Sequence, residues 1–349
     1  MTSPRDGDAP VSLPVAMVVG RGPWGDATAT MLTEHAIATP DRVDVREAVA
    51  RVGVEPRPAV AVVTDADPDD RVLVACLASG VPVVDVHRSI AAVDRARTAM
   101  RAGTLVAASG WGGGAAAVVV AAACQEVGGP PADHVEVAAL LAPGDRAGDA
   151  WWRRFAGLHR SFMVYEGGQR RLVRGLGEPR AVDFAHGRRR ARRVASPEQE
   201  TLVETGASRS AAVRVAFAEG RTNVWLALLV GSGAWRFLPA AWRARILRPR
   251  TGQRSGGHEV DVVVAHAQGV VRARIVAVHG LAHLVAAGAC VQVGRLLRTP
   301  ADDDAATPPA NVLTSQRVSH PEESDDPCAD LATLRALGIQ VDLEVRRSP

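Results

Sequence analysis

The first part of the chain alternates short valine-rich runs with helical stretches, and this alternation limits the fold more than any other feature. The runs Leu13–Val19, Ala59–Thr64, Val81–Val86 and Thr104–Ala108 are apolar almost throughout. Such runs are typical of strands that are buried on both faces of a sheet. Strands that alternate with helices form a parallel sheet with helices on both sides. We therefore predict a doubly wound α/β domain.

A glycine motif stands between the first strand and the first helix. Residues 20–25 read Gly-Arg-Gly-Pro-Trp-Gly, and a helical stretch, Asp26–His35, follows at once. In G-x-G-x-x-G the first glycine permits a tight turn, the second lets the backbone approach a pyrophosphate, and the third lets the helix pack close to the strand. The helix N-terminus then attracts the phosphates. The motif predicts a Rossmann-like turn with these cofactor-binding residues: Gly20, Arg21, Gly22, Pro23, Trp24 and Gly25.

The second strand of such a domain is not visible in the sequence. It ends, in dinucleotide-binding domains, at an acidic residue about 20 positions after the motif that holds the adenosine ribose. Here the strand is either very short, at Ala36–Ala38, or lost. Four residues compete for the adenosine end: Asp41, Arg42, Asp44 and Arg46. The cofactor is therefore predicted as NAD or NADP, without a choice between the two.

Polar residues at the ends of later strands extend the predicted site. The carboxyl ends of parallel strands meet at one edge of the sheet, where ligands bind. Asp65 and Ala66 follow one strand and are predicted to contact the cofactor, with Asp65 near the nicotinamide ribose. The alternative is that Asp65 and Asp67 cap the next helix, because aspartate is a preferred N-cap residue.

The same edge supplies candidates for substrate binding and proton transfer. His87 follows a strand end, and histidine changes charge near neutral pH, so we predict it as the catalytic proton donor. Ser109, Trp111 and Gly112 belong to a glycine-rich turn and are predicted to bind substrate. Trp111 would stack on the nicotinamide or the substrate, or act as a hydrophobic lid. Arg88 would bind a phosphate or a substrate carboxylate through its guanidinium.

No metal site is predicted. His279 and His283 are four residues apart, but no third ligand follows at a suitable spacing, so they are interpreted as core or cleft-wall residues. Tyr165 precedes a Glu-Gly-Gly-Gln loop and is interpreted as part of a hairpin.

The pattern changes after residue 129. Alternating runs joined by hairpin loops indicate a mostly antiparallel α+β domain over residues 129–298. Residues 299–310 are rich in proline and aspartate, as in a linker. We therefore predict a nucleotide-binding domain over residues 1–128, completed by 311–349, with the α+β domain inserted for substrate binding or dimerisation.

The order of these elements resembles the saccharopine dehydrogenase-like family of oxidoreductases. The segments that carry the resemblance are Val18–Gly25, Gly80–Val86, Ser109–Gly114, Glu178–Phe184, Ser196–Gln199, Val312–Ser315 and Leu334–Gly338. The resemblance implies NAD(P)H-dependent reduction of an imine, formed from an amine and an oxo acid, or of a related unsaturated small molecule, in the cleft between the domains. It also implies a homodimer. The alternative is a non-catalytic scaffold with a degenerate cofactor site, which the missing second strand favours.

Composition excludes several other classes. The chain contains no lysine, so all 41 basic side chains are arginine, and Schiff-base chemistry and a Walker-type phosphate loop are ruled out. The net charge is only +3, and the one dense run of arginines, Arg188–Arg193, has no aromatic residues beside it. We expect no nucleic-acid partner and interpret the run as a solvated face.

The cysteines, the N-terminus and two apolar stretches bear on where the protein is located and whether it crosses a membrane. The four cysteines stand far apart and are interpreted as thiols in a reducing compartment. The N-terminus lacks the basic start and apolar core of a signal peptide. The apolar stretches Thr104–Gln125 and Ile275–Gly294 are interrupted by turn residues, so buried α/β packing explains them better than a membrane span. The expectation is a cytoplasmic protein without a membrane partner.

Overall fold

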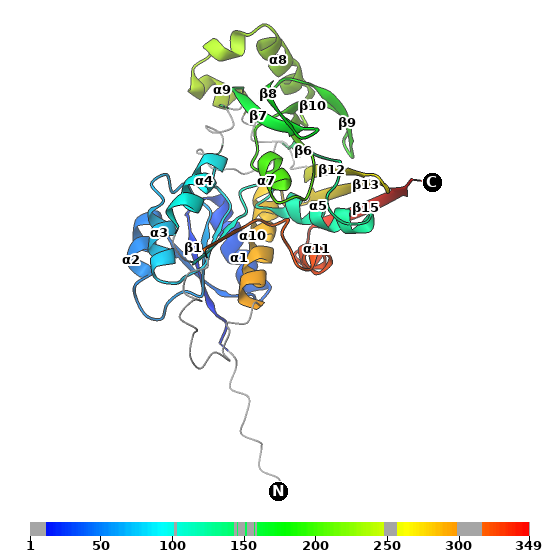
Figure 1. The fold of residues 1–349 in the computed structure, drawn as a ribbon. Helices are drawn as coiled ribbons and strands as arrows, with labels where there is room; N and C mark the ends of the chain where they lie inside the picture. Colours follow the sequence, from blue (N-terminus) through cyan, green and yellow to red (C-terminus); the bar gives the residue numbers. More distant parts are fainter. Residues whose placement is uncertain are drawn as a thin grey trace.

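Two sheets organise the molecule (Figure 1). The computed structural model describes residues 12–100, 103–142, 145, 151, 157, 159–247, 257–298 and 316–348. The predicted linker 299–310 and the segment Val312–Ser315 lie outside these residues.

The first sheet is parallel throughout. Its strands are, in spatial order, β14 (Gln316–Ser319), β5 (Gly103–Ala107), β4 (Val83–Asp85), β3 (Val60–Val63), β1 (Val15–Val19) and β2 (Thr39–Val43). The buried side chains of β1 alternate: Met17 and Val19 belong to one core cluster, Ala16 and Val18 to the other. Both faces of the sheet are therefore covered, which confirms the predicted doubly wound α/β domain.

Helices cover the two faces in a simple division. On the face of Met17 lie α2 (Val45–Arg51), α3 (Arg71–Ala78) and α4 (Ile90–Ala99). On the face of Ala16 lie α1 (Pro23–Glu34) and α10 (Leu281–Arg298), which pack against each other.

The order of the strands creates one switch point. Strand β2 is the neighbour of β1 on one side, and strand β3, which follows in the chain, is the neighbour of β1 on the other side. Crevices outside the carboxyl ends of strands at such a point are where open α/β sheets bind ligands. The glycine motif follows β1, and Asp65 and Ala66 follow β3, so both lie at this crevice.

The expectation of a lost or very short second strand was wrong. Strand β2 covers Thr39–Val43 and pairs in parallel with β1 over five residues. It forms the edge of the sheet, and only Val43 is buried. An edge strand accommodates Pro40, because the missing N–H would face away from the ladder. The strand therefore carries no apolar run for the sequence to reveal.

The second sheet is mixed but mainly antiparallel, as predicted. Its strands are, in spatial order, β15 (Gln340–Arg347), β13 (Gly269–Ala277), β12 (His258–His266), β6 (His134–Leu141), β11 (Ala211–Phe217), β10 (Gly187–Arg193) and β9 (Arg180–Phe184). Only β6 and β11 pair in parallel. A separate hairpin, β7 (Ser161–Glu166) and β8 (Gln169–Arg174), confirms the predicted turn at residues 166–169.

The C-terminal segment serves both sheets, unlike the prediction that residues 311–349 complete the first domain. Strand β14 does extend the parallel sheet, beside β5. Strand β15, however, pairs with β13 of the second sheet, and α11 (Pro327–Ala336) packs on α5 (Ala115–Glu126). The sequence of β15 alternates polar and apolar residues. This alternation is typical of a strand in an antiparallel sheet that has one face packed and the other exposed to solvent.

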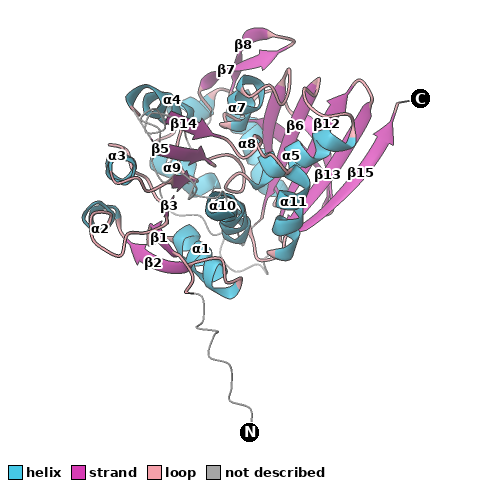
Figure 2. Ribbon diagram, turned by 60° about the horizontal axis from the view of Figure 1, so that its bottom comes forward, coloured by secondary structure: helices cyan, strands magenta, loops and turns pink. Residues whose placement is uncertain are grey.

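The two apolar stretches form the core between the sheets (Figure 2). Helices α5, α10 and α11 lie there, and α10 is buried over most of its length. No helix among the described residues is both long and apolar enough to cross a membrane. Cys76, Cys124 and Cys290 are buried, and Cys328 is exposed.

The arginine run is only partly a solvated face. Arg188 and Arg190 are exposed on β10, and Arg189 and Arg192 are half-buried. Arg193 is buried and pairs with Glu166 and Glu178. Burial of a guanidinium requires such partners, since its desolvation is costly.

Helix α10 approaches backbone so closely that glycine is required at one position. A Cβ atom on Gly288 would lie 2.4 Å from the carbonyl oxygen of Gly112. We expect Gly288→Ala to lower the free energy of unfolding by about 3 kcal/mol, because the backbone cannot yield. On the same helix, Gly294 faces only the end of the flexible Arg298 side chain, at 3.3 Å. Gly294→Ala should leave stability unchanged or raise it by up to about 1 kcal/mol. Urea unfolding of both variants checks this, and equal effects would contradict it.

Candidate functional site

The glycine motif forms a turn in which each glycine has a different task. Gly20 has φ +137° and donates its N–H to the carbonyl oxygen of Val43 at 3.0 Å. A Cβ atom on Gly25 would lie 2.2 Å from the carbonyl oxygen of Gly20, so helix α1 reaches the end of β1 only because this residue has no side chain. A Cβ atom on Gly22 would meet nothing within 4 Å. The space beside the second glycine is therefore open, as a ligand cradle requires.

The first turn of α1 presents free backbone donors at this open space. Gly22 is the N-cap and makes no side-chain cap, and Pro23 occupies the first turn. Among the described residues, the N–H groups of Trp24 and Gly25 have no acceptor. Unpaired helix-start amides together with the helix dipole bind phosphate groups. The residues predicted to hold the cofactor's diphosphate thus have the geometry that this role needs.

One of the four candidates for the adenosine end, Asp44, stands at the end of β2. Asp44 follows β2 directly and begins α2 with a capping box: it accepts the N–H of Glu47 at 2.9 Å, and Glu47 accepts the N–H of Asp44 at 2.9 Å. The hydrogen bond from the Glu47 N–H helps hold the pKa of Asp44 below its ordinary value. The competing candidates are engaged elsewhere, Asp41 with Arg51 and Arg42 with Asp26.

Arg21 lies at this acidic corner. Its guanidinium donates to both carboxylate oxygens of Glu47, at 2.8 and 3.0 Å, and lies 3.9 Å from Asp44. The side chain is about two-thirds exposed, at 65%. The role predicted for Arg21 as a phosphate ligand would require it to leave these carboxylates.

The residues after β3 divide between the two roles considered for them. Asp67 caps α3, because its carboxylate accepts the N–H of Arg71 at 3.0 Å and that of Val72 at 2.9 Å. Asp65 makes only a local hydrogen bond, to the N–H of Ala66 at 2.8 Å, and both residues are exposed. Asp65 and Ala66 therefore remain accessible at the switch point, beside Gly20.

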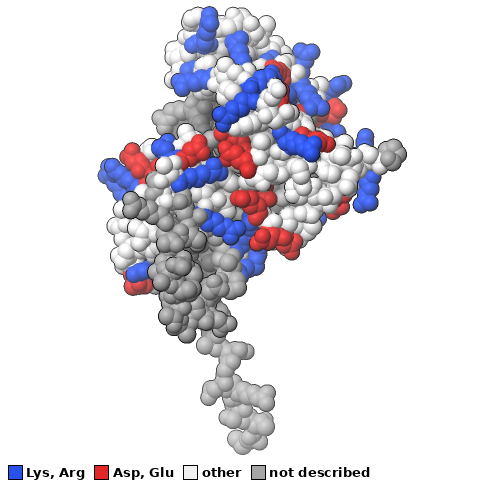
Figure 3. Space-filling model, in the orientation of Figure 1, with Lys and Arg blue, Asp and Glu red and all other residues white. Residues whose placement is uncertain are grey.

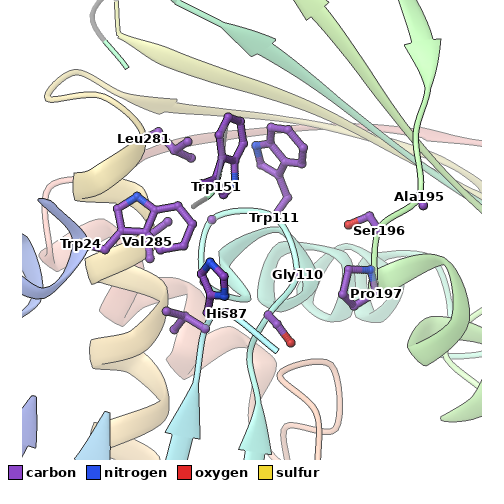
Figure 4. Close-up of a pocket in the computed structure, with 14 residues that line it drawn as sticks. Trp24, His87, Gly110, Trp111, Trp151, Ala195, Ser196, Pro197, Leu281 and Val285 are labelled. Atoms are coloured by element: carbon purple, nitrogen blue, oxygen red, sulfur yellow. The ribbon is translucent and has the colours of Figure 1, made fainter. Parts of the chain in front are cut away.

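A pocket opens where the two sheets meet (Figure 4). It contains about 630 Å³ of unfilled space, part of it open to solvent. Its described lining residues come from both halves of the chain: Trp24, Val86, His87, Ser109, Gly110, Trp111, Gly112, Gly113, Trp151, Ala195, Ser196, Pro197, Leu281 and Val285. The structure thus brings together His87, Ser109, Trp111 and Gly112, four residues predicted to act on substrate.

Aromatic rings form the walls of this pocket. The ring centroids of the His87 imidazole and the Trp24 indole are 6.0 Å apart, and the two ring planes are inclined at 52°. Trp24 Nε1 and Ser109 Oγ are shielded from solvent and have no hydrogen-bond partner among the described residues. Buried polar atoms are almost always paired in folded proteins, with protein groups, water or a ligand. Both groups can therefore donate a hydrogen bond to a water molecule or a ligand in the pocket.

A buried hydrogen-bonded chain, which the sequence did not reveal, fixes Trp111. The indole N–H donates to His258 Nε2 at 2.9 Å, and His258 Nδ1 lies 2.8 Å from Asp145 Oδ2. Because the indole nitrogen can only donate, the imidazole proton lies on Nδ1 and is donated to Asp145. The rings of Trp111 and His258 are stacked, with their centroids 6.0 Å apart. Trp111 is therefore held rigidly in the pocket wall, which a mobile lid would not be.

The buried carboxylate of Glu198 also holds the turn that carries Trp111. Its carboxylate accepts the N–H of Trp111 and the hydroxyl of Ser196. A Cβ atom on Gly110 would lie 2.6 Å from Cδ of Glu198. Gly112 and Gly113 have φ of +68° and +63° and press against α10. The glycines after β5 thus let the turn fit between a buried carboxylate and a helix, and Gly112 has a packing role beside its predicted substrate role.

The prediction that Arg88 binds substrate was wrong. Its side chain is only 2% exposed, with Nε 3.0 Å from Asp85 Oδ2 and a second ion pair to Asp70. Burial alone would lower the pKa of Arg88, but Asp85 and Asp70 outweigh it and raise that pKa. Arg88 therefore joins β4 to the start of α3 through these two ion pairs.

The histidine pair lies outside the pocket. The rings of His279 and His283 are 5.0 Å apart, on a shallow depression beside α1. Within the described ranges, no cluster of three histidine, cysteine, aspartate or glutamate side chains is arranged to hold a metal ion.

No protein-family model matches the sequence, and no curated protein is significantly similar to it. Three solved structures resemble it over nearly its whole length. An oxidoreductase from Sinorhizobium meliloti is 9% identical over 94% of this chain and 96% of that chain, with a TM-score of 0.37. GenD2 from gentamicin A biosynthesis, in complex with NAD, is 14% identical over 100% of both chains, with a TM-score of 0.39.

The third is an oxidoreductase from Agrobacterium radiobacter in complex with NAD+, L-tartaric acid and magnesium. It is 11% identical over 94% of this chain and 95% of that chain, with a TM-score of 0.38. The sequence identities and TM-scores of all three are low, so they carry no argument about function, which must come from the geometry of the site. Membership of the saccharopine dehydrogenase-like family stays a prediction.

A second carboxyl group is buried near Glu198. Glu322 follows β14, and both of its carboxylate oxygens are shielded from solvent. Burial raises the pKa of Glu322 to about 7, and the Glu198 carboxylate adds to the rise. An acid whose pKa is raised on folding stabilises the native state at low pH and loses that contribution as the pH climbs through the folded pKa.

We expect Glu322→Gln to stabilise the protein relative to wild type at pH 8, but not at pH 4. The difference in unfolding free energy should grow between about pH 4.5 and pH 7 and reach roughly 3 kcal/mol, since one pKa unit corresponds to about 1.4 kcal/mol. Asp325→Asn, at an exposed neighbour, is the control and should show no such slope. Chemical unfolding at several pH values measures both, and a pH-independent difference would contradict the assignment.

Proposed function

We propose that the protein is an NAD-dependent oxidoreductase. One observation carries the proposal: at the switch point of a parallel sheet, the space beside Gly22 is open and faces the unpaired N–H groups of Trp24 and Gly25. A dinucleotide diphosphate fits that arrangement, because its charge is matched by the amides and the helix dipole. When bound, a reduced nicotinamide supplies a hydride to an unsaturated carbon.

The acidic corner favours NAD over NADP. Asp44 and Glu47 lie at the end of β2, where a carboxylate can accept the hydroxyl groups of the adenosine ribose. The 2′-phosphate of NADP would meet both carboxylates there. Arg21 already neutralises them in part, but it is shared between the two.

The aromatic pocket supports a substrate with a flat or apolar group beside the reacting carbon. Trp24, Trp111 and Trp151 offer large rigid surfaces for such a group. Ser109 Oγ and Trp24 Nε1 can donate hydrogen bonds to it. An imine from an amine and an oxo acid remains our leading substrate class, and a carbonyl of similar shape is the second.

His87 is the proposed proton donor. It follows β4, lines the pocket between the two domains and faces Trp24. Its backbone N–H donates to Asp85 at 2.8 Å, and Asp85 is held in turn by Arg88, so the backbone that carries the imidazole is fixed by buried charges. Reduction of a C=N or C=O bond leaves a nitrogen or oxygen that needs one proton, which an imidazolium can supply.

The main argument for a non-catalytic scaffold was the missing second strand. Strand β2 is present and ends at Val43, directly before Asp44, so that argument no longer applies. A scaffold role is now the outcome to which a failed binding experiment would lead.

Cofactor binding can be tested with a substitution that should not harm folding. Gly22 has an ordinary φ of −83° and open space beside it, and aspartate is a favoured N-cap residue. We expect wild type to bind NADH at least tenfold more tightly than NADPH, and Gly22→Asp to weaken NADH binding by about a hundredfold or more through charge repulsion. Quenching of tryptophan fluorescence during titration measures both.

The control for this titration is Gly53→Asp, which adds the same carboxylate at another open position, in the loop after α2. It should bind NADH as wild type does. Absence of binding by wild type, or equal binding by Gly22→Asp, would reject the proposed cofactor site.

The role of His87 can be separated from cofactor binding. We expect His87→Gln to lower kcat by roughly a hundredfold to ten-thousandfold, the usual contribution of a general acid, and to change the Kd for NADH by less than about twofold. The fall in rate on the alkaline side of the pH–rate profile, where a general acid has lost its proton, should disappear with it. The assay is NADH consumption with pairs of amines and oxo acids and with carbonyl compounds.

His279→Gln replaces an exposed histidine outside the pocket and is the control. It should keep the wild-type rate. An unchanged rate in His87→Gln would remove that residue from the mechanism while leaving the cofactor site untouched.

A further inference from the structure

An apolar surface is exposed at the end of the second domain. Helix α8 (Gly220–Gly231), the short 3₁₀ helix η1 (Ala234–Phe237) and helix α9 (Ala240–Leu247) follow one another after β11. Phe237 is 76% exposed, Trp242 61% and Trp225 59%. Among the described residues, these three account for every large aromatic side chain that stands out as exposed. Single exposed leucines or valines are ordinary, whereas a concentration of exposed tryptophan and phenylalanine indicates a binding surface.

The exposed residues of α8 share one face of the helix. Val224, Trp225 and Leu228 lie within about a quarter of the helical circumference, at 100° per residue, and each is about 60% exposed. Leu226 and Val230, on the opposite side, are buried in the main core. Helix α8 is thus apolar on its outer face as well as its inner one. A surface helix of a protein surrounded only by water normally presents polar residues outward.

The charge of this segment has one sign. Between Glu219 and Glu259 the sequence holds no aspartate or glutamate but has seven arginines: Arg221, Arg236, Arg243, Arg245, Arg248, Arg250 and Arg254. The whole chain has almost balanced charge, 41 basic against 38 acidic residues, so this separation is local. Arg236 is exposed, and its guanidinium stacks over the Phe237 ring at 4.6 Å, which places charge and aromatic surface together.

The segment projects from the molecule. In Figure 1, α8 and α9 form the end of the second domain that lies farthest from the parallel sheet. In Figure 3 the same end shows arginine side chains among uncharged atoms. A projecting surface can contact a flat target without a clash from the rest of the protein.

We propose that the α8–η1–α9 segment is a docking surface for an anionic lipid bilayer. Tryptophan, phenylalanine and leucine side chains enter the boundary between head groups and acyl chains, and arginines on the same segment pair with lipid phosphates. A second copy of this chain fits less well, because a symmetric dimer would bring the same arginine-rich segments face to face. The surface lies on the membrane and does not span it. It therefore differs from the buried apolar stretches, Thr104–Gln125 and Ile275–Gly294, that first raised the membrane question.

Co-sedimentation with lipid vesicles tests the proposal on the full-length protein. We expect binding to vesicles that contain about 30% phosphatidylglycerol in phosphatidylcholine, and at least tenfold weaker binding to phosphatidylcholine alone or at high salt. The double variant Trp225→Ser/Leu228→Ser should lose at least tenfold in vesicle affinity. The pair Arg236→Glu/Arg245→Glu should lose a similar factor, through charge instead of apolar area.

Matched controls change exposed residues elsewhere. Val54→Ser in the loop after α2 and Val74→Ser on α3 remove apolar side chains that are 54% and 60% exposed, and Arg188→Glu with Arg346→Glu reverses two exposed charges. All should bind vesicles as wild type does, and thermal unfolding should show each variant folded. The proposal is overturned if wild type does not sediment with anionic vesicles, if the controls lose binding equally, or if the α8 variant instead converts a dimer into a monomer. Titration of NADH is independent of these results.

Discussion

The contact between Gly25 and the carbonyl oxygen of Gly20 places helix α1, and the geometry of the whole site depends on it. The space for a side chain at position 25 is absent, since its first carbon would lie 2.2 Å from that oxygen. The helix therefore starts directly above the end of β1, between β2 and β3. This position directs the unpaired amides of the first turn at the crevice and brings Trp24 to the pocket between the sheets. If a side chain at position 25 pushed the helix away from β1, the amides would no longer point at the crevice and Trp24 would no longer line the pocket.

The second domain is tied to the first by buried polar groups more than by charge pairs on the surface. Glu198, from α7 (Glu198–Glu204), reaches the turn after β5, and His258 of β12 reaches the Trp111 indole of the same turn. Asp145 in turn accepts the N–H of Leu281 at 2.9 Å, at the start of α10. In a site of low polarity each of these groups would be costly without its partner, so the set holds one arrangement of the two domains. The pocket lies inside that arrangement and takes its shape from it.

The parts of the fold that follow from local chemistry could be predicted from the sequence. Strands β1, β3, β4 and β5 are buried on both faces and therefore show apolar runs, and the glycine motif has a fixed place between β1 and α1. Strand β2 was missed because an edge strand with one buried residue leaves no such run. Arg88 was misassigned because its position at a strand end is the same for an ion pair as for a ligand contact.

His258 could not be predicted, since 147 residues separate it from Trp111 and only the paired sheets bring them together. Trp24 shows a different consequence of chain order. It stands two positions after Gly22, yet its ring lines the pocket, so one helical turn would serve both the proposed cofactor site and the proposed substrate site. Altered kinetics in a protein changed at either position will therefore mix the two binding events, and only separate equilibrium titrations can tell them apart.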